Sequence, residues 1–244
     1  MAADFLRVEQ LTVAFGGIFA LNDVSLSIEE GRTTAILGPN GAGKTTLFNA
    51  ISGAVRPTAG KIRFFGENIS TKSPSSRCHS GIARTFQITQ PFGGLSVIEN
   101  VMVALATKGA SMAKARHEAA TYVDFVGLTA KAEDPARVLS TGQRKRLELA
   151  RALATHPRLL LLDEVTGGVD RPSIPELLSL IRRLREERRT TIVVVEHNME
   201  VLLDLADDAV FLNRGELVVT GGMEEVAGHD AVRSIYLGDI DAAA

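Results

Sequence analysis

The sequence has few of the residues that define several protein classes. It contains a single cysteine, Cys78, which excludes an intrachain disulfide and is typical of a reducing compartment. No run of 18 or more apolar residues occurs, so the chain is not expected to cross a bilayer by itself. The first ten residues carry Asp4, Arg7 and Glu9 in place of the apolar core of a signal peptide. These features predict a cytoplasmic protein.

A strong charge of either sign is also absent. The formal net charge is −2, so no global basic field indicates nucleic acid as a partner. No second cluster of ligating residues accompanies the cysteine, which argues against a zinc site, and we expect its thiol to lie in a loop. Hydrophobic residues make up 45% of the chain and charged residues 23%, the mix of an ordinary globular protein with a sizeable core.

The most informative motif that is present is a phosphate-binding loop. Residues 38–45 fit the pattern G-x-x-x-x-G-K-[ST], between an apolar run at 35–37 and a helix-compatible stretch at 46–51. Glycines let backbone N–H groups surround phosphate oxygens, and the helix start adds further donors. Lys44 can reach the β- and γ-phosphates, and Thr45 offers a hydroxyl to Mg²⁺. The expected nucleotide-binding residues are Gly38, Pro39, Asn40, Gly41, Ala42, Gly43, Lys44, Thr45 and Thr46.

Hydrophobic periodicity divides the chain into three blocks. The first, to about residue 87, is rich in β-structure, with strands expected at 8–13, 24–28 and 61–65. The second, about 88–156, is rich in helix, with helices expected at 97–107, 113–126 and 144–155. The third alternates, with expected strands at 159–162 and 191–195, a helix at 173–189, and a hairpin that joins 209–212 to 217–219. A helical insertion in an α/β core is the simplest architecture.

Two acids follow the buried strand predicted at 159–162. Asp163 and Glu164 would stand at its carboxyl end, where ligands bind in open α/β sheets. Successive strand residues point to opposite faces, so the two acids can serve different roles. Asp163 can hold Mg²⁺, directly or through water, and Glu164 can polarise the attacking water as a general base. On its own such a pair is more often a helix cap, but its pairing with the phosphate loop favours the chemical role.

A third motif opens the helix predicted near 144–155. Ser140 as N-cap with Gln143 three residues later fits a capping box, which is a structural interpretation. A capped helix start beside a glycine is also a phosphate site. The run Leu139, Ser140, Thr141, Gly142, Gln143 is similar to the Leu-Ser-Gly-Gly-Gln signature of the ATP-binding cassette (ABC) ATPases, and the resemblance covers nearly the whole chain.

The resemblance implies a fold. The implied fold is that of an α/β P-loop NTPase with a mainly parallel core sheet, an N-terminal antiparallel β subdomain and a helical insertion. Residues 1–87 and 157–244 would form the ATP-binding core, and residues 88–156 the helical subdomain that carries the signature. An Asn-Lys-x-Asp sequence of the kind that binds guanine in small GTPases is not present.

The resemblance also implies roles for single positions. Gln87 corresponds to the glutamine that joins the core to the insertion and contacts Mg²⁺ and the attacking water. Phe15 stands where the family places an aromatic ring against adenine; a core-packed residue at a strand end is the alternative. His197 corresponds to the switch histidine that contacts the γ-phosphate, although such a histidine can also be purely structural. Asp170 falls in the loop that lies across the dimer interface.

In this family two subunits close head to tail over two ATP molecules. Ser140, Thr141, Gly142 and Gln143 would therefore act in trans, on the nucleotide of the partner, in a homodimer or in a heterodimer with a second ABC ATPase. The implied reaction is Mg²⁺-dependent ATP hydrolysis. Its implied partners are transmembrane permease subunits that dock near residues 90–95 and, indirectly, a solute-binding protein, which places the chain on the inner face of the cell membrane. Nucleic acid is not an expected partner.

The subfamily follows from shorter stretches. Residues 81–87, 98–100, 196–201 and 236–238 resemble the ATPase subunits of branched-chain amino acid importers, with urea importers and lipopolysaccharide exporters as close relatives. A lipopolysaccharide-type exporter, or a soluble ABC ATPase acting on DNA or ribosomes, is the alternative. The soluble class usually has a long coiled-coil insertion, two cassettes or extra cysteines. A regulatory module without turnover would be expected to lose Glu164 or His197. The sequence does not encode the substrate or the direction of transport.

Two positions depart from the family pattern, and two basic runs have simple explanations. Thr141 replaces the commonest signature glycine, and Val165 replaces the proline that usually follows the acidic pair, which predicts a looser following loop. The arginines within 182–189 alternate with glutamates and are expected to form a solvated helix face. The run at 144–146 is expected to lie mostly on a helix surface.

Overall fold

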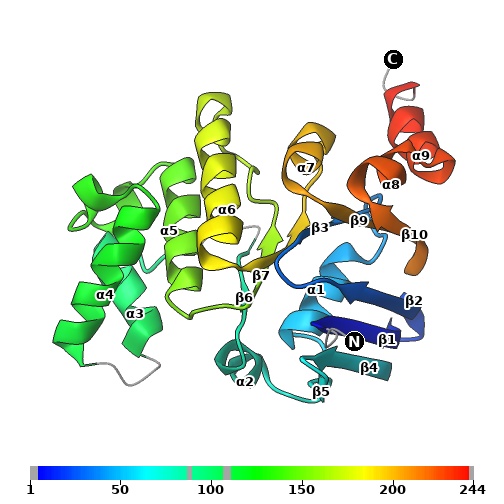
Figure 1. The fold of residues 1–244 in the computed structure, drawn as a ribbon, viewed down its shortest axis with the longest axis horizontal. Coiled ribbons are helices and arrows are strands. Elements are labelled where there is room, and N and C mark those ends of the chain that lie inside the picture. Colours follow the sequence, from blue (N-terminus) through cyan, green and yellow to red (C-terminus); the bar gives the residue numbers. More distant parts are fainter. Residues whose placement is uncertain (1–4, 87–89, 107–110, 242–244) are drawn as a thin grey trace. The chain divides into compact units, whose positions relative to one another are not determined.

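The structure is a computed structural model, and it describes residues 5–86, 90–106 and 111–241. The chain separates into two compact units. The first unit comprises Met1–Arg77 and Thr190–Ala244, and the second unit comprises Cys78–Arg189. Figure 1 shows the helices and strands of both units, most of them with the labels used below.

The first unit contains an antiparallel sheet. Its strands are β1 (Leu6–Phe15), β2 (Ile18–Ile28), β4 (Ala59–Phe64) and β5 (Glu67–Asn68), in the order β2-β1-β4-β5. The buried side chains of β1 change parity along the strand, from Leu6 and Val8 to Leu11 and Val13. Gln10, with φ of 48°, lies at the irregularity in register between these pairs. A bulge at this point therefore keeps all four apolar side chains on the core face.

The first unit also contains four further strands, the first of which leads to the phosphate loop. They are β3 (Thr33–Leu37), β8 (Thr191–Val195), β9 (Asp208–Asn213) and β10 (Glu216–Gly222). Strand β3 is parallel to both β8 and β9, and β10 returns antiparallel to β9. Every residue of β3 and β8 is buried, as expected for parallel strands covered on both faces. The helices of this unit are α1 (Lys44–Ser52), α7 (Met199–Leu205), α8 (Met223–Gly228) and α9 (Asp230–Asp241).

A buried arginine closes the C-terminal end of α1. Arg77 is 1% exposed, and its guanidinium donates to the carbonyl oxygens of Ala50 and Ile51 in the last turn of α1. It also donates to the carbonyl oxygens of Ser70 and Lys72. Burial lowers the pKa of Arg77 to about 10, so the side chain remains a cation at neutral pH. A cation at this end complements the helix dipole.

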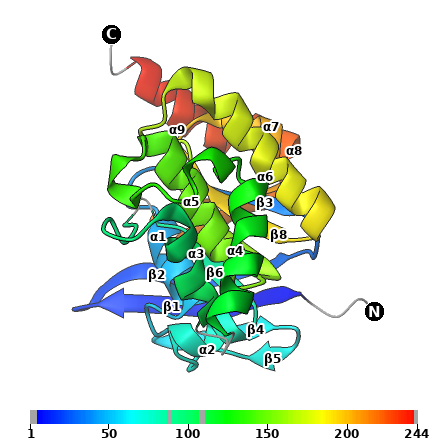
Figure 2. The ribbon, with the colours of Figure 1, turned by 90° about the vertical axis from the view of Figure 1, so that its left-hand side faces the viewer.

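The second unit combines a short parallel strand pair with four longer helices. Strand β6 (Ile82–Arg84) is parallel to β7 (Leu159–Asp163). The helices are α3 (Val97–Ala106), α4 (Met112–Phe125), α5 (Thr141–Leu153) and α6 (Ile174–Arg188), with 3-10 turns at Thr129–Lys131, Ala136–Val138 and Arg171–Ser173. Figure 2 shows α3, α4 and α5 packed together, and α5 also contacts α6.

Most of the elements predicted from periodicity are confirmed. The helix expected at 144–155 begins earlier, at Thr141, so the signature residues form its first turn. The expectation of a loop around Cys78 is wrong, since this residue lies in a helix, α2 (Pro74–His79). Strand β6 and helices α2, α7 and α8 were not predicted because each is too short to show a full period.

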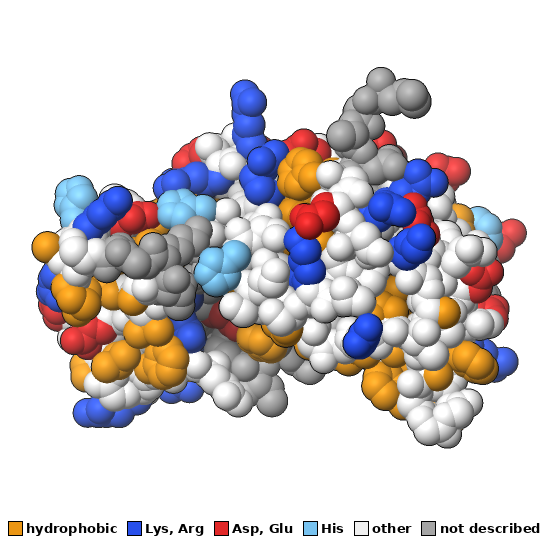
Figure 3. All heavy atoms as spheres, turned by 90° about the horizontal axis from the view of Figure 1, so that it is seen from below, with side chains coloured by type: hydrophobic (Ala, Val, Ile, Leu, Met, Phe, Trp, Pro, Cys, Tyr) orange, Lys and Arg blue, Asp and Glu red, His pale blue; other side chains and the backbone are white. Residues whose placement is uncertain are grey.

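Within the described residues, no helix is long and apolar enough to cross a membrane. Figure 3 shows basic and acidic side chains interspersed on one face, with hydrophobic side chains in separate patches among them. This mixture agrees with the small net charge of the chain.

Candidate functional site

The phosphate loop runs from the end of β3 to the start of α1 and packs closely against the backbone of β9 and β2 in the first unit. Gly38 has φ of 146°, and a Cβ added there would lie 2.2 Å from the carbonyl oxygen of Leu212. Gly43 has φ of 102°, and a Cβ there would lie 2.6 Å from the carbonyl oxygen of Ala20. Both positions therefore require glycine for their backbone conformation and for the space around them.

The lysine of the motif lies inside this loop. Lys44 is 7% exposed, and its Nζ donates to the carbonyl oxygens of Gly38 at 2.5 Å and Pro39 at 3.0 Å. It is the first residue of α1, whose N-cap is Gly43, so no side chain caps the helix start. The first N–H groups of α1 and an ammonium ion thus converge at one place, while Thr45 is exposed. Such an arrangement binds an anion such as phosphate.

His197 stands at the same edge of the sheet as the phosphate loop. It follows β8, and β8 is the parallel neighbour of β3, so both strands deliver their carboxyl ends to this edge. The residue before it, Glu196, is 4% exposed, whereas the His197 side chain is exposed. Asn198 then caps α7 by accepting from the backbone N–H of Glu200 at 2.9 Å. The structure therefore fixes the backbone on both sides of His197.

Phe15 lies at the end of β1, beside the turn to β2. Its side chain is 53% exposed, so the alternative of a core-packed aromatic residue is wrong. Ile18 and Phe19, on the other side of the turn, are 75% and 59% exposed. The hairpin therefore presents apolar side chains to its surroundings, as a stacking surface for a planar ring requires.

A cavity of about 440 Å³ opens beside the phosphate loop in the first unit. Helix α9 contributes Ser234 and Ile235 to its wall, the end of β9 contributes Asn213, and the turn after it contributes Arg214. The remaining lining residues are Pro39, Asn40, Gly41 and Ala42. This surface of the loop is therefore open to another molecule.

In the second unit, Asp163 ends β7 and is fixed by neighbouring side chains. It is 6% exposed, and its Oδ2 accepts from Arg84 Nη2 at 2.8 Å in a largely buried ion pair. Its backbone N–H donates to Thr85 Oγ1 at 3.2 Å. Arg84 is the last residue of the short strand β6, and Thr85 is the residue after it. Sequence reasoning did not identify Arg84, because an arginine at the end of a three-residue strand carries no motif.

Glu164 has an unusual backbone that a buried lysine stabilises. Its φ is 47°, in the left-handed region that costs a residue with a Cβ about 1–3 kcal/mol. Lys145, 4% exposed, donates from Nζ to the carbonyl oxygen of Glu164 at 2.9 Å. The expectation that residues 144–146 form a surface run is therefore wrong for Lys145. This lysine orients the peptide that carries the predicted general base.

The signature residues form the start of α5. Ser140 Oγ accepts the N–H of Gln143 at 3.3 Å, and Gln143 Oε1 accepts the N–H of Ser140 at 3.0 Å, so the predicted capping box is confirmed. Gly142 is buried, and a Cβ there would lie 3.6 Å from Val169. Asp170 Oδ2 accepts from Ser173 Oγ at 2.8 Å. The signature and the predicted dimer loop are therefore in contact within one unit.

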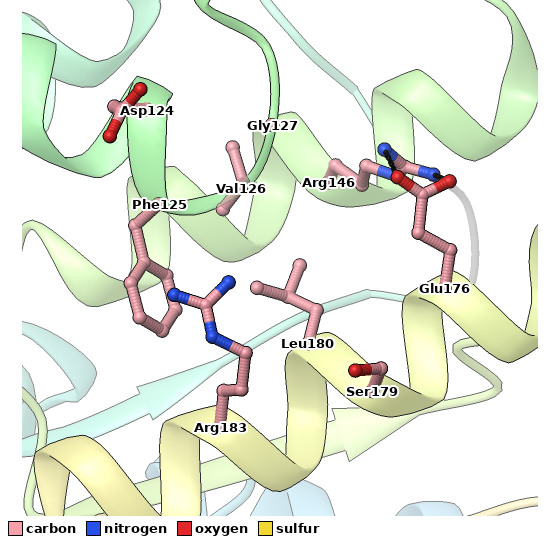
Figure 4. Close-up of a pocket in the computed structure, with 9 residues that line it drawn as sticks. All are labelled: Asp124, Phe125, Val126, Gly127, Arg146, Glu176, Ser179, Leu180 and Arg183. Carbon is pink, nitrogen blue, oxygen red and sulfur yellow. Dashed lines mark hydrogen bonds and ion pairs between the residues drawn. The ribbon is translucent and has the colours of Figure 1, made fainter.

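The arginines of α6 contact more than solvent. Arg183 pairs with Glu187 at 2.9 Å, as expected from the alternation of charges. Its guanidinium also lies 4.5 Å from the centre of the Phe125 ring of α4, and that of Arg188 lies 5.2 Å from the same ring. Figure 4 shows Arg183 and Phe125 on the wall of a cavity of about 150 Å³, which contains none of the predicted site residues. These arginines thus join α6 to α4.

The donor groups available to a cation are oxygens. Thr45 offers a hydroxyl in the first unit and Asp163 a carboxylate in the second, and such ligands suit Mg²⁺. The third predicted ligand, Gln87, lies outside the described residues. Among the residues that the structure describes, no group of three or more His, Cys, Asp or Glu could hold a metal ion by itself. The structure thus brings the phosphate loop and His197 together in one unit, and Asp163, Glu164, the signature and Asp170 together in the other.

Comparisons with known proteins agree with this geometry. The family model described as ABC transporter matches residues 21–167. The high-affinity branched-chain amino acid transport ATP-binding protein BraF of Pseudomonas aeruginosa is 36% identical, over 98% of this chain and 100% of BraF.

Solved structures of ATP-binding cassettes have the same fold. A cassette of an ABC transporter in its ADP conformation aligns with a TM-score of 0.86 and 30% identity, over 96% of this chain and 98% of that one. A dimeric cassette in a post-hydrolysis state, bound to ADP and Pi, aligns with a TM-score of 0.79 and 28% identity, over 89% of this chain and 98% of that one. This chain belongs to the ABC transporter family and is an ATP-hydrolysing cassette.

Proposed function

We propose that the chain powers a membrane importer of branched-chain amino acids or a related small polar solute. The observation that carries this proposal is the similarity to BraF, which spans 98% of this chain and all of that transport protein. The positions of the residues support it: the phosphate loop leads into α1, the two acids lie at the carboxyl end of β7, the signature begins α5, and His197 lies beyond the end of β8.

The chemistry assigned to these residues is hydrolysis of the γ-phosphate of ATP. The first N–H groups of α1 and Lys44 bind the phosphates, and Phe15 stacks on adenine. Glu164 accepts a proton from the water whose oxygen attacks the γ-phosphorus, and the bond to the ADP oxygen breaks. His197 contacts the γ-phosphate. Thr45, Asp163 and Gln87 would hold Mg²⁺, which would neutralise charge on the phosphates.

The active form proposed is a head-to-tail dimer of two copies, or of one copy and a second ABC ATPase. Ser140, Thr141, Gly142 and Gln143 contact the nucleotide of the partner, and Asp170 lies across the interface. The dimeric cassette bound to ADP and Pi, whose fold this chain shares, supports this arrangement. Release of the γ-phosphate contacts reopens the pair, and that motion drives the attached protein.

The attached protein is a permease, which holds the chain on the inner face of the cell membrane and brings it indirectly to a solute-binding protein. Residues 88–156 form the proposed signature subdomain, and residues 1–87 and 157–244 the ATP-binding core. Residues 90–95 are the proposed docking surface, and within it Phe92 is 47% exposed. Nucleic acid is not part of this proposal.

The experiment that tests the proposal is purification of a tagged Glu164→Gln variant with Mg-ATP from detergent-solubilised native membranes. The variant should retain bound ATP and the closed dimer, so its partners should stay attached. Recovery of amino acid permease subunits is the expected result. Permease subunits of a lipopolysaccharide-type exporter would replace the importer with an exporter, and ribosomes or DNA without membrane protein would contradict a transport role.

A further inference from the structure

The turn between β9 and β10 lies against the phosphate loop. It has two residues, Arg214 and Gly215, because Asn213 pairs directly with Glu216. Their φ values are 48° and 82°, as a type I′ turn requires. In such a turn the flanking residues pair with each other, so the N–H and the carbonyl oxygen of the second central residue remain for other partners. In this chain they bind two other segments of the first unit.

Gly215 joins β2 to the phosphate loop. Its carbonyl oxygen accepts the backbone N–H of Asn22 at 2.8 Å, and its own N–H donates to the carbonyl oxygen of Ala42 at 3.0 Å. Ala42 belongs to the phosphate loop and is 2% exposed. A Cβ added to Gly215 would lie 2.9 Å from the carbonyl oxygen of Ala20, and one added to Gly43 would lie 3.6 Å from the Cα of Gly215. The turn is therefore packed tightly between β2 and the loop.

The hydrogen bond to Ala42 fixes the direction of a phosphate-binding group. The carbonyl oxygen of Ala42 and the N–H of Gly43 belong to one planar trans peptide, so they point in opposite directions. Because Gly215 holds the oxygen, the N–H of Gly43 points away from the turn. Gly43 is also the N-cap of α1, the helix end at which the phosphates are proposed to bind. A shift of the turn would therefore change the direction of this N–H.

Two side chains hold the turn against β2. Asn22 Nδ2 donates to Glu216 Oε1 at 3.0 Å, so the strand and the residue after the turn are joined by side chains as well as by backbone. Both residues are exposed. Each can therefore be replaced without opening the core, which makes this hydrogen bond suitable for testing the position of the turn.

We propose that Gly215 is a positioning residue for nucleotide binding, and that the hydrogen bond between Asn22 and Glu216 keeps it in place. Gly215 acts through the peptide between Ala42 and Gly43 and does not touch the nucleotide. The inference rests on the proposed role of the phosphate loop in binding ATP. It assigns a part in binding to a turn that lies far along the chain from the loop.

ATP titration and steady-state ATPase kinetics of Gly215→Ala test the proposal. The added Cβ has to displace the turn from β2, so ATP affinity should fall about tenfold or more, because a hydrogen bond to a charged phosphate is weakened. KM for ATP should rise to a similar extent. The kcat at saturating ATP should change less than about twofold, since the substitution affects binding rather than the chemical step. Normal ATP affinity in this variant would overturn the proposal.

The β4–β5 hairpin offers a matched control. Its turn also has two residues, Phe65 and Gly66, with φ of 49° and 77°. No atom lies within 4 Å of a Cβ added to Gly66, so Gly66→Ala strains its turn without displacing a neighbouring segment. Urea unfolding should show a loss of stability in this control, while its ATP affinity stays that of the wild type. A loss of affinity as large as in Gly215→Ala would mean that strain alone explains both, and the proposal would be wrong.

Side-chain variants decide the proposal if Gly215→Ala does not fold. Glu216→Ala and Asn22→Ala should each lower ATP affinity about threefold, because each removes the same hydrogen bond. For that reason the double variant should lose no more than either single variant. Glu216→Gln keeps an oxygen that can accept from Asn22, so it should retain wild-type affinity. Losses that multiply in the double variant, or normal affinity in both single variants, would contradict the proposal.

Lys44→Ala in the same titration separates this inference from the assignment of the phosphate loop. It removes the ammonium group that lies inside the loop, so ATP binding should be lost. If Lys44→Ala loses binding while Gly215→Ala binds normally, only the inference about Gly215 fails. If Lys44→Ala binds ATP normally, the assignment of the loop fails, and the inference fails with it.

Discussion

The two units hold their candidate site residues in different ways. In the first unit the phosphate loop binds through backbone groups, and glycines at Gly38 and Gly43 make that backbone possible. In the second unit the acids are held by buried charged side chains, with Arg84 on Asp163 and Lys145 on the carbonyl oxygen of Glu164. A loop that binds through backbone groups needs its glycines for its conformation. In a network of side chains, by contrast, single substitutions can remove the contacts one by one.

The largest effect is expected at the chemical centre of the second unit. Glu164→Gln removes the general base and should lower kcat about 10²–10⁴-fold. ATP binding should persist, because the phosphate loop lies in the other unit. Single-turnover hydrolysis together with a nucleotide-binding titration measures the two separately. Wild-type turnover in this variant would contradict the assignment of Glu164.

In the backbone-built half, Gly38→Ala should strongly impair ATP binding. The added Cβ would meet the carbonyl oxygen of Leu212 at 2.2 Å, so the loop must move. Gly31→Ala is the matched control, since its φ of 77° is also positive but no atom lies within 4 Å of the added Cβ. That control should cost only about 1–2 kcal/mol of stability and leave ATP affinity intact. Nucleotide titration and urea unfolding of both variants sharpen the contrast.

In the half built from side chains, Lys145→Met should be more damaging than Arg146→Met, although the two residues are adjacent. Lys145 is buried and donates to the carbonyl oxygen of Glu164. Loss of such a bond costs about 1–3 kcal/mol and frees the peptide that follows the general base. Arg146, whose side chain is 13% exposed, pairs with Glu176, whose side chain is 68% exposed, and a pair with one partner in solvent is expected to contribute about 0–1 kcal/mol. Equal unfolding free energies and equal kcat in the two variants would remove the distinction.

The smallest expected effect is a pH dependence of stability at Glu148. Burial raises the pKa of this acid in the folded state, so its contribution to stability is fully present at low pH and is lost as pH rises through the folded pKa. Glu148→Gln does not titrate there. The melting temperature of the variant relative to the wild type should therefore rise from acid to neutral pH. A difference that is constant with pH would show that the carboxylate is not perturbed.

The contrast between the two halves also explains what sequence could predict. The phosphate loop, the strand before Asp163 and the capping box of Ser140 depend on neighbours in sequence, so local pattern identified them. Arg84 and Lys145 act on residues far along the chain, and an arginine or lysine has the same local signature whether it is exposed or buried. Phe15 was predicted at a site, but only the structure excluded its packing in the core.

The buried Arg77 has a consequence for nucleotide binding that follows from thermodynamic linkage. Helix α1 begins at the phosphate loop and ends on the guanidinium of Arg77, so an anion and a cation stabilise the opposite ends of one short helix. A ligand that binds only the intact helix stabilises all of it by mass action. Bound ATP therefore protects the last turn of α1 against local unfolding. Loss of Arg77, which does not contact the nucleotide, in turn lowers the affinity of the phosphate loop for ATP.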